Sequence, residues 1–204
     1  MKREDWDARY ADLGPVTALQ PNRFVAMETA QLPPGRVLDL ACGEGRNAVW
    51  LAAQGWQVTG IDFSEVAIER ARRLADARRV SAEFVVGDVF AIPLERARYD
   101  LVLIAYLQVG PEQRGAVLER AVDALAPGGT LLLVAHDLRN LTEGHGGPSS
   151  ASVLWTVEEA TDALRAHGLV VERGEEVRRE VEGAPGPAID TLVRARLGTS
   201  SRDS

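Results

Sequence analysis

Cysteine, basic charge and long apolar runs are scarce in this sequence. Cys42 is the only cysteine among 204 residues, which excludes an internal disulfide framework and a zinc site built from cysteines. No apolar run reaches the length of a membrane-spanning helix, so we expect no membrane partner. The net charge of −7 disfavours general binding to nucleic acid, because such binding depends on neutralising phosphates.

One globular domain over residues 1–204 is the default for a chain of this length and composition. Within it we expect helices over 1–34, a core over 35–198 and a frayed tail over 199–204. The first residues, Met1–Trp6, do not have the pattern of a signal peptide. We therefore expect a cytoplasmic protein, either a monomer or a homodimer.

A glycine turn between a short strand and a helix organises the chain. Residues 36–40 predict a strand and residues 47–54 predict a helix. Between them, Gly43 and Gly45 lack a Cβ, so the backbone can approach a ligand closely and can take positive φ. A strand, a glycine turn and a helix N-terminus together form an edge that can bind a nucleotide-sized ligand. A plain tight turn is the alternative.

Two acidic residues indicate which ligand this turn binds. Asp39 ends the first strand, and Asp62 ends the next strand, over 56–62. The distance in sequence from Asp39 to Asp62 is close to the spacing of about 20 residues that is typical of a ribose-binding acid. A carboxylate at the turn would repel a pyrophosphate by about 1 to 4 kcal/mol at a separation of about 4 Å. It would instead attract the ammonium and sulfonium groups of S-adenosylmethionine. Asp39 therefore favours this cofactor over a dinucleotide.

The residues from Leu38 to Gly45 resemble the first motif of the class I S-adenosylmethionine-dependent methyltransferases. That motif usually reads Asp/Glu-x-Gly-x-Gly-x-Gly. Here Ala41 replaces the first glycine and Asn47 replaces the third. The resemblance implies that the loop binds the cofactor.

Within that family, the run from Cys42 to Asn47, with residues 51–56 behind it, is similar to the small methyltransferases grouped with tellurite-resistance and thiopurine enzymes. Their acceptors are thiols and selenium or tellurium oxyanions. The tellurite members carry a His-Arg pair before the final hairpin, whereas this chain reads Val177-Arg178-Arg179. The resemblance therefore implies a soft acceptor but not which one.

The elements further along the chain fit the fold of that family. The sequence predicts strands over 82–86, 99–105, 130–135, 169–172, 175–181 and 189–197, and helices over 65–77, 113–125 and 157–167. The resemblance implies a Rossmann-like α/β fold with a seven-stranded, mostly parallel sheet. A C-terminal antiparallel hairpin would close the sheet and an N-terminal helical lid would cover it.

The resemblance also implies where the cofactor binds. Gly87-Asp88-Val89 is similar to a motif in which the acid meets the adenine amino group and the next backbone N–H meets a ring nitrogen. Asp88 could instead cap a turn, and Phe63 could either lie against the adenine or pack in the core. The expected cofactor residues are Asp39, Ala41, Cys42, Gly43, Gly45, Arg46, Asn47, Asp62, Phe63, Ser64, Gly87, Asp88, Val89, Ala105 and Tyr106.

Two helices are predicted ahead of the first strand. Residues 6–13 place Trp6, Tyr10 and Leu13 on one helical face, and residues 22–31 can form a second helix. Such segments can fold over a ligand as a lid, or they can be plain packing helices. We expect Tyr10 to close the opening over the methyl acceptor.

The acceptor pocket is expected at the carboxyl ends of the strands over 99–105 and 130–135, because open α/β sheets bind ligands at this edge. Tyr106 and His136 follow these strands. His136 is the only histidine placed to act as a general base, and the alternative is a strand-end residue bonded to its neighbours. Arg139 and Arg178 could attract an anionic acceptor, although solvated arginines are commoner.

The sequence thus predicts an enzyme, without a metal, that moves a methyl group from S-adenosylmethionine to a small molecule. A thiol or another chalcogen nucleophile is the candidate acceptor. Two alternatives remain. One is an NAD(P)-dependent oxidoreductase, which Asp39 and the lack of a second substrate domain disfavour. The other is a non-catalytic S-adenosylmethionine-binding protein.

Overall fold

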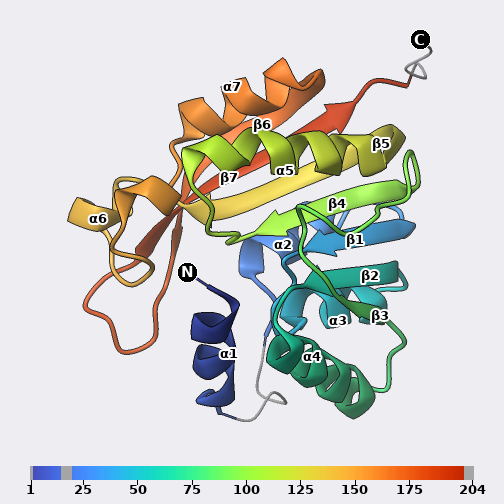
Figure 1. Ribbon diagram of the computed structural model, residues 1–204. Coiled ribbons are helices and arrows are strands. Elements are labelled where there is room, and N and C mark those ends of the chain that lie inside the picture. The colour runs from blue at the N-terminus through green and yellow to red at the C-terminus, as the bar shows by residue number, and fades with distance from the viewer. Residues whose placement is uncertain (1, 15–19, 200–204) are drawn as a thin grey trace.

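A single twisted sheet forms the centre of the computed structural model, which describes residues 2–14 and 20–199 (Figure 1). Its strand order is β3-β2-β1-β4-β5-β7-β6. Strand β7 runs antiparallel to both of its neighbours, β5 and β6, and all other neighbouring strands are parallel. The strands are β1 (Arg36–Leu40), β2 (Gln57–Asp62), β3 (Glu83–Val86), β4 (Tyr99–Ala105), β5 (Leu125–His136), β6 (Leu169–Arg179) and β7 (Ala188–Leu197). This arrangement confirms the expected fold, including its antiparallel hairpin.

Helices cover both faces of the sheet, which explains why the central strands are mostly apolar. One face is covered by α5 (Pro111–Ala124) and α7 (Val157–Ala166). The other face is covered by α2 (Arg23–Thr29), α3 (Arg46–Ala53) and α4 (Glu65–Arg78). No helix in the described part of the chain is long and apolar enough to cross a membrane.

The two N-terminal helices behave differently. In α2, Phe24 and Val25 are buried in the core, and buried Glu28 forms ion pairs with Arg173 and Arg194. This helix therefore packs on the sheet.

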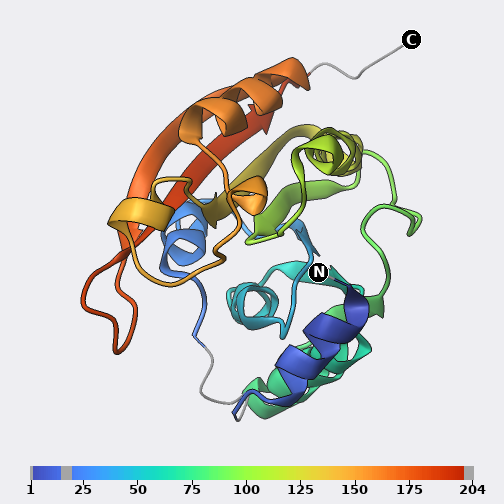
Figure 2. The ribbon, with the colours of Figure 1, turned by 60° about the vertical axis from the view of Figure 1, so that its left-hand side comes forward.

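The first helix, α1 (Arg3–Ala11), has no buried residues and lies along α4 (Figure 2). Its contacts with α4 include the hydrogen bond that Ser64 donates to Asp7. Arg70 of α4 bonds the carbonyl oxygens of Leu13 and Gly14 just beyond the helix and also pairs with Glu44. Polar contacts of this kind tie α1 to α4 and to the glycine loop without a shared apolar core.

Several details depart from the sequence prediction. The edge strand β6 is continuous, whereas the sequence predicted strand structure over 169–172 and again from residue 175. A bulge between Val171 and Arg173 shifts the register with β7, and the pairing continues beyond it. A short helix, α6 (Asn140–Glu143), and a 3-10 turn (Ala151–Val153) follow β5 and were not predicted. The frayed tail expected over 199–204 lies, apart from Thr199, outside the described residues.

Candidate functional site

The loop after β1 needs glycine for two different reasons. Gly43 has φ of 55°, and a Cβ there would lie 2.8 Å from the hydroxyl of Tyr10. Gly45 has φ of 74° and begins α3, and a Cβ there would lie 2.8 Å from the Cβ of Ala71 in α4. Gly43 thus keeps space beneath α1, whereas Gly45 lets α3 pack closely on α4. Ala41, in place of the usual first glycine, also takes positive φ, at 59°.

A cavity of about 610 Å³ opens at the carboxyl ends of the central strands. Of the expected cofactor residues it is lined by Asp39, Ala41, Cys42, Gly43, Arg46, Asn47, Asp62, Phe63, Asp88, Val89, Ala105 and Tyr106. Gly45, Ser64 and Gly87 do not line it. Instead, Gly45 provides helix packing, and the Ser64 hydroxyl caps α4 by accepting a hydrogen bond from the Ala67 N–H at 3.0 Å.

Asp62 joins the loop to the end of β2. Its Oδ2 accepts a hydrogen bond from the Gly43 N–H and its Oδ1 accepts one from the Ser64 N–H, both at 2.9 Å. Burial raises the pKa of Asp62 above its ordinary value, and these two backbone bonds oppose that rise. Each oxygen retains acceptor capacity, which suits a ligand that offers hydroxyl groups.

Asp39 is the most unusual group in the cavity. It is 1% exposed, and neither of its carboxylate oxygens has a hydrogen-bond partner. Burial and the nearby Asp62 raise its pKa to about 8, while Arg46 acts in the opposite direction. A buried carboxyl without partners is costly, and a bound cation would relieve that cost. The residues present therefore fit a cofactor with a positively charged end.

Two further polar residues line the cavity, Asp88 after β3 and Tyr10 in α1. Asp88 is exposed and accepts a hydrogen bond from the Phe90 N–H at 2.9 Å, so it does cap a turn, and it lines the cavity as well. Tyr10 of α1 reaches the cavity, and burial followed by the charge of Asp62 raises its pKa.

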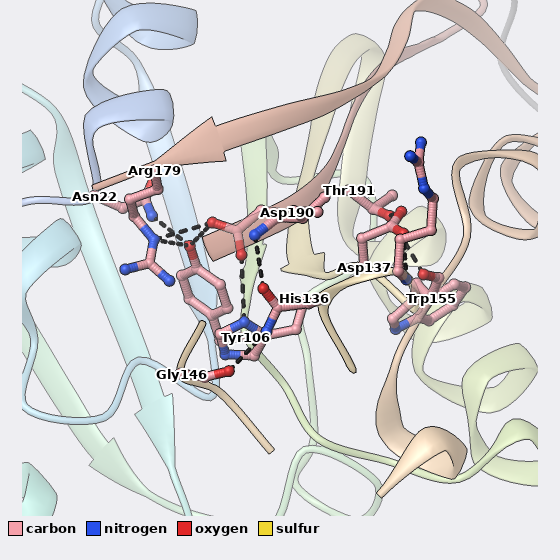
Figure 3. Close-up of polar contacts among 12 residues, drawn as sticks. Asn22, Tyr106, His136, Asp137, Gly146, Trp155, Arg179, Asp190 and Thr191 are labelled. Carbon is pink, nitrogen blue, oxygen red and sulfur yellow. Dashed lines mark hydrogen bonds and ion pairs between the residues drawn. The ribbon is translucent and has the colours of Figure 1, made fainter. Parts of the chain in front are cut away.

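A second cluster of polar side chains surrounds Tyr106 at the cavity wall (Figure 3). The Tyr106 hydroxyl donates a hydrogen bond to Asp190 Oδ2 at 2.6 Å and accepts one from the Asn22 amide at 2.8 Å. Arg179 Nε donates to Asp190 Oδ2 at 3.0 Å and to the Tyr106 hydroxyl at 3.2 Å. Burial and then the charge of Asp190 raise the pKa of Tyr106, so the phenol remains a donor.

The backbone at Tyr106 is strained, with φ of 61°, which is uncommon for an aromatic residue. Such strain persists only where the surroundings hold it, and it gathers at functional sites. Here the hydroxyl network and the His136 ring, whose centroid lies 4.6 Å from that of Tyr106, hold the side chain at the cavity wall.

His136 also lines the cavity, at the end of β5. Its Nδ1 is buried and lies 3.2 Å from Asp190 Oδ1, although the two atoms are not aligned as a hydrogen bond. The structure therefore brings together Tyr10, Tyr106 and His136, as the sequence prediction placed them around one pocket.

Arg139 and Arg178, expected near the acceptor, do not line the cavity. Arg139 is exposed and pairs with Glu143 and Glu176, and the side chain of Arg178 is 55% exposed. Arg179 lines the cavity instead. Side chains alternate along β6, so Arg179 points to the face that carries Asp190 and Arg178 points away from it.

Asp190, Arg179 and Asn22 were missed by the sequence interpretation, as were Trp6, Arg9 and Gln108 on the cavity wall. A signal for Asp190 was present: it is an acid directly after the apolar pair Ala188-Ile189 at the start of β7, and it is 0% exposed. For Asn22 there was no such signal, because its role depends on the distant Tyr106.

Known proteins resemble this chain in sequence and in fold. Residues 37–129 match the model of a methyltransferase domain. The ribosomal RNA small subunit methyltransferase C of Alcanivorax borkumensis is 36% identical over 54% of this chain and 35% of its own length. The demethylmenaquinone methyltransferase of Thermus thermophilus is 36% identical over 54% of this chain and 50% of its own length. The chain thus spans half or less of the curated relatives that it matches.

Similarity in fold extends over the whole chain. A solved structure reported for the conversion of a disulfide bond into a thioacetal group during echinomycin biosynthesis is 27% identical, with a TM-score of 0.77. It covers 98% of this chain, which covers 94% of that one. A structure of a Burkholderia thailandensis methyltransferase with bound S-adenosylhomocysteine is 22% identical and similar in fold, with a TM-score of 0.72; it covers 96% of this chain, which covers 87% of that one. The fold of the chain is that of the class I S-adenosylmethionine-dependent methyltransferases.

Proposed function

We propose that this protein transfers a methyl group from S-adenosylmethionine to a small molecule whose acceptor is a thiol or another chalcogen nucleophile. The observation that carries the proposal is Asp39, a buried carboxyl whose two oxygens have no partner within a cavity of about 610 Å³. A nicotinamide dinucleotide would bring phosphates to this carboxyl, whereas S-adenosylmethionine brings positive charge.

Within this proposal the chain's residues have separate roles toward the cofactor. Asp62 accepts hydrogen bonds from the ribose hydroxyls, and Asp88 meets the adenine amino group. Asp39 faces the ammonium of the methionine end. Arg46, for which no ion pair is found among residues 2–14 and 20–199, is placed to bind the carboxylate. When bound, S-adenosylmethionine supplies a methyl group activated by its sulfonium.

The acceptor end is lined by Tyr106, His136 and Arg179, and the buried Asn22 amide supports the Tyr106 hydroxyl. These groups can orient a small polar molecule, and His136 can take a proton from it. Orientation at about 3 to 3.5 Å provides much of the rate increase in such a displacement. Closing α1 over the opening, with Tyr10 at the glycine loop, would exclude water.

Sulfur is favoured by two considerations. A thiol has a pKa of about 8.5, so a single histidine is a sufficient base for it. The echinomycin-pathway structure, which matches nearly the whole chain, is associated with the chemistry of a sulfur substrate. Relatives that act on ribosomal RNA are less apt guides, because this chain is acidic, with a net charge of −7.

The test is a screen for release of S-adenosylhomocysteine in the presence of small thiols, selenite, tellurite and phenols. Turnover with a thiol or a chalcogen oxyanion, lost in Asp39→Ala, supports the proposal. Calorimetry with S-adenosylmethionine and with NAD tests the cofactor separately. Tight binding of S-adenosylmethionine without any methyl transfer would favour the non-catalytic alternative, and preferential binding of NAD would overturn the proposal.

A further inference from the structure

Asp190 and His136 are opposite each other in the antiparallel ladder between β5 and β7. The sheet register, and not a flexible loop, fixes the distance between them. Asp190 Oδ1 lies 3.2 Å from His136 Nδ1, and both atoms are buried without a hydrogen-bond partner. Figure 3 shows the imidazole with this nitrogen turned toward the carboxylate of Asp190.

The second oxygen of Asp190 is already committed. Oδ2 accepts a hydrogen bond from the Tyr106 hydroxyl at 2.6 Å and another from Arg179 Nε at 3.0 Å. Burial would raise the pKa of Asp190, but the contacts with His136 and Tyr106 and the charge of Arg179 together lower it. Asp190 is therefore an ionised carboxylate, which can only accept hydrogen bonds.

We propose that Asp190 is a positioning residue that keeps the imidazole hydrogen of His136 on Nδ1, so that the lone pair of Nε2 faces the methyl acceptor. The inference rests on the proposed function, because it assigns His136 the role of base in that reaction. An acceptor-only group at Nδ1 selects the tautomer that has its hydrogen there. Nδ1 of His136 is a buried atom without a hydrogen-bond partner, and Nε2 is not one.

The proton and electron balance of the step is simple. The acceptor atom gives its proton to Nε2 and its electron pair to the methyl carbon. The bond between that carbon and the cofactor sulfur breaks, which leaves a neutral thioether. The charged groups around His136 are Asp190 on β7 and Arg179 on β6, with Arg46 of α3 beyond the Tyr106 ring. Asp190 stabilises the imidazolium until the proton passes to solvent.

Neighbouring residues keep the ring in this orientation. The Tyr106 ring packs beside it, and Gly147 lies against its other edge, where a Cβ would be 3.0 Å from Nδ1 and Cε1. The Asn140 side chain fixes that segment, because it donates to the Gly146 carbonyl at 2.6 Å and accepts from the Ile189 N–H at 2.7 Å. Asn140 therefore links the loop over His136 to the strand that carries Asp190.

Asp190→Asn provides a sharp test. Tyr106 and Arg179 both donate toward Oδ2, so the new amide oxygen should take that place and the amide NH₂ should face His136 Nδ1. An NH₂ group donates, so it would select the opposite tautomer, with hydrogen on Nε2 and no base toward the acceptor. Nitrogen NMR of the imidazoles in the cofactor-free protein, above neutral pH, reports the tautomer directly. With three histidines in the chain, His145→Gln and His167→Gln variants assign the signals.

We expect hydrogen on Nδ1 of His136 in the wild type and on Nε2 in Asp190→Asn. The variant's kcat should fall by about 10² to 10⁴, with the Kd for S-adenosylmethionine unchanged. Asp137→Asn is the matched control, since Asp137 is also buried beside this site but bonds Thr191 and the Arg139 N–H instead of His136. It should leave the His136 tautomer unchanged.

Two results would overturn the inference: hydrogen on Nε2 in the wild type, or an unchanged kcat in a variant whose tautomer has switched. The NMR experiment needs neither cofactor nor acceptor. If the proposed function failed while the tautomer switched as expected, the positioning of His136 by Asp190 would stand and only the reaction would need reassignment.

Discussion

The Gly43 N–H donates a hydrogen bond to Asp62 Oδ2 at 2.9 Å, which joins the glycine loop to the end of β2. Asp62→Ala should therefore weaken S-adenosylmethionine binding by about 2 to 4 kcal/mol, through loss of the ribose contacts and of this support for the loop. Calorimetry measures the change. Glu69→Ala, which removes an exposed acid of α4, is the control and should not alter the affinity. An equal affinity in the two variants would contradict the role of Asp62.

Asp39→Asn separates the two cofactor classes by the sign of its effect. If the cavity binds S-adenosylmethionine, removing the carboxylate should lower the affinity, because attraction to a positively charged group is lost. If the ligand were a dinucleotide, relief of repulsion should instead raise the affinity. Titration of both proteins with both ligands decides between them.

The same substitution should change how stability depends on pH. The pKa of Asp39 rises from 3.8 to about 8 on folding, so the folded protein holds a proton that the unfolded chain releases. The free energy of unfolding should therefore fall as pH rises between these two values, by at most about 1.4 kcal/mol per pH unit. Urea unfolding of the cofactor-free protein should show that Asp39→Asn removes this decline. A parallel decline in both proteins would assign it to other groups.

His136→Ala should lower kcat by about 10² to 10⁴ while the affinity for S-adenosylmethionine stays intact. The loss should shrink at high pH, where a thiol acceptor ionises without help. Rate measurements across pH with a verified acceptor test this expectation. Unaltered turnover in the variant would reduce His136 to a structural residue, and a loss that is the same at every pH would restrict it to orienting the acceptor.

Arg179 and Arg178 form a natural pair for testing substrate attraction. Arg179→Leu removes a guanidinium from the cavity wall together with its bonds to Asp190 and Tyr106, so it should raise the KM for an anionic acceptor about tenfold or more. Arg178→Leu removes an exposed guanidinium from the neighbouring position and should leave KM unchanged. A larger effect of Arg178→Leu would return the acceptor contact to that residue.

Two single-methyl changes in the glycine loop should have opposite effects on stability. Ala41→Gly relieves an alanine at φ of 59° and should raise the free energy of unfolding by about 0.5 to 1 kcal/mol. Gly45→Ala places a Cβ 2.8 Å from Ala71 at φ of 74°, and should lower it by about 2 kcal/mol or more. Chemical denaturation of both variants measures the two changes, and a destabilised Ala41→Gly would show that the alanine side chain contributes packing that outweighs its strain.

The sequence by itself determined the parts of this protein that depend on local pattern. Apolar runs between turn residues predict β1 and β4, because both faces of these strands are covered. Asp39 and Asp62 could be recognised because each ends a strand beside the glycine turn, where chain order alone brings parallel strand ends to one edge. The cap that Ser64 forms on α4 is equally local, because it involves only the next three residues.

Only the tertiary structure assembles the polar cluster around Tyr106. Asn22, Tyr106, Arg179 and Asp190 meet there from four separate elements, so their contacts follow from strand order and register and not from spacing in the chain. A one-residue difference in β6 separates Arg179 in the cavity from Arg178 in solvent, because successive side chains of a strand face opposite ways. Only pairing with β7 fixes which of the two faces inward, and the same pairing sets Asp190 against His136.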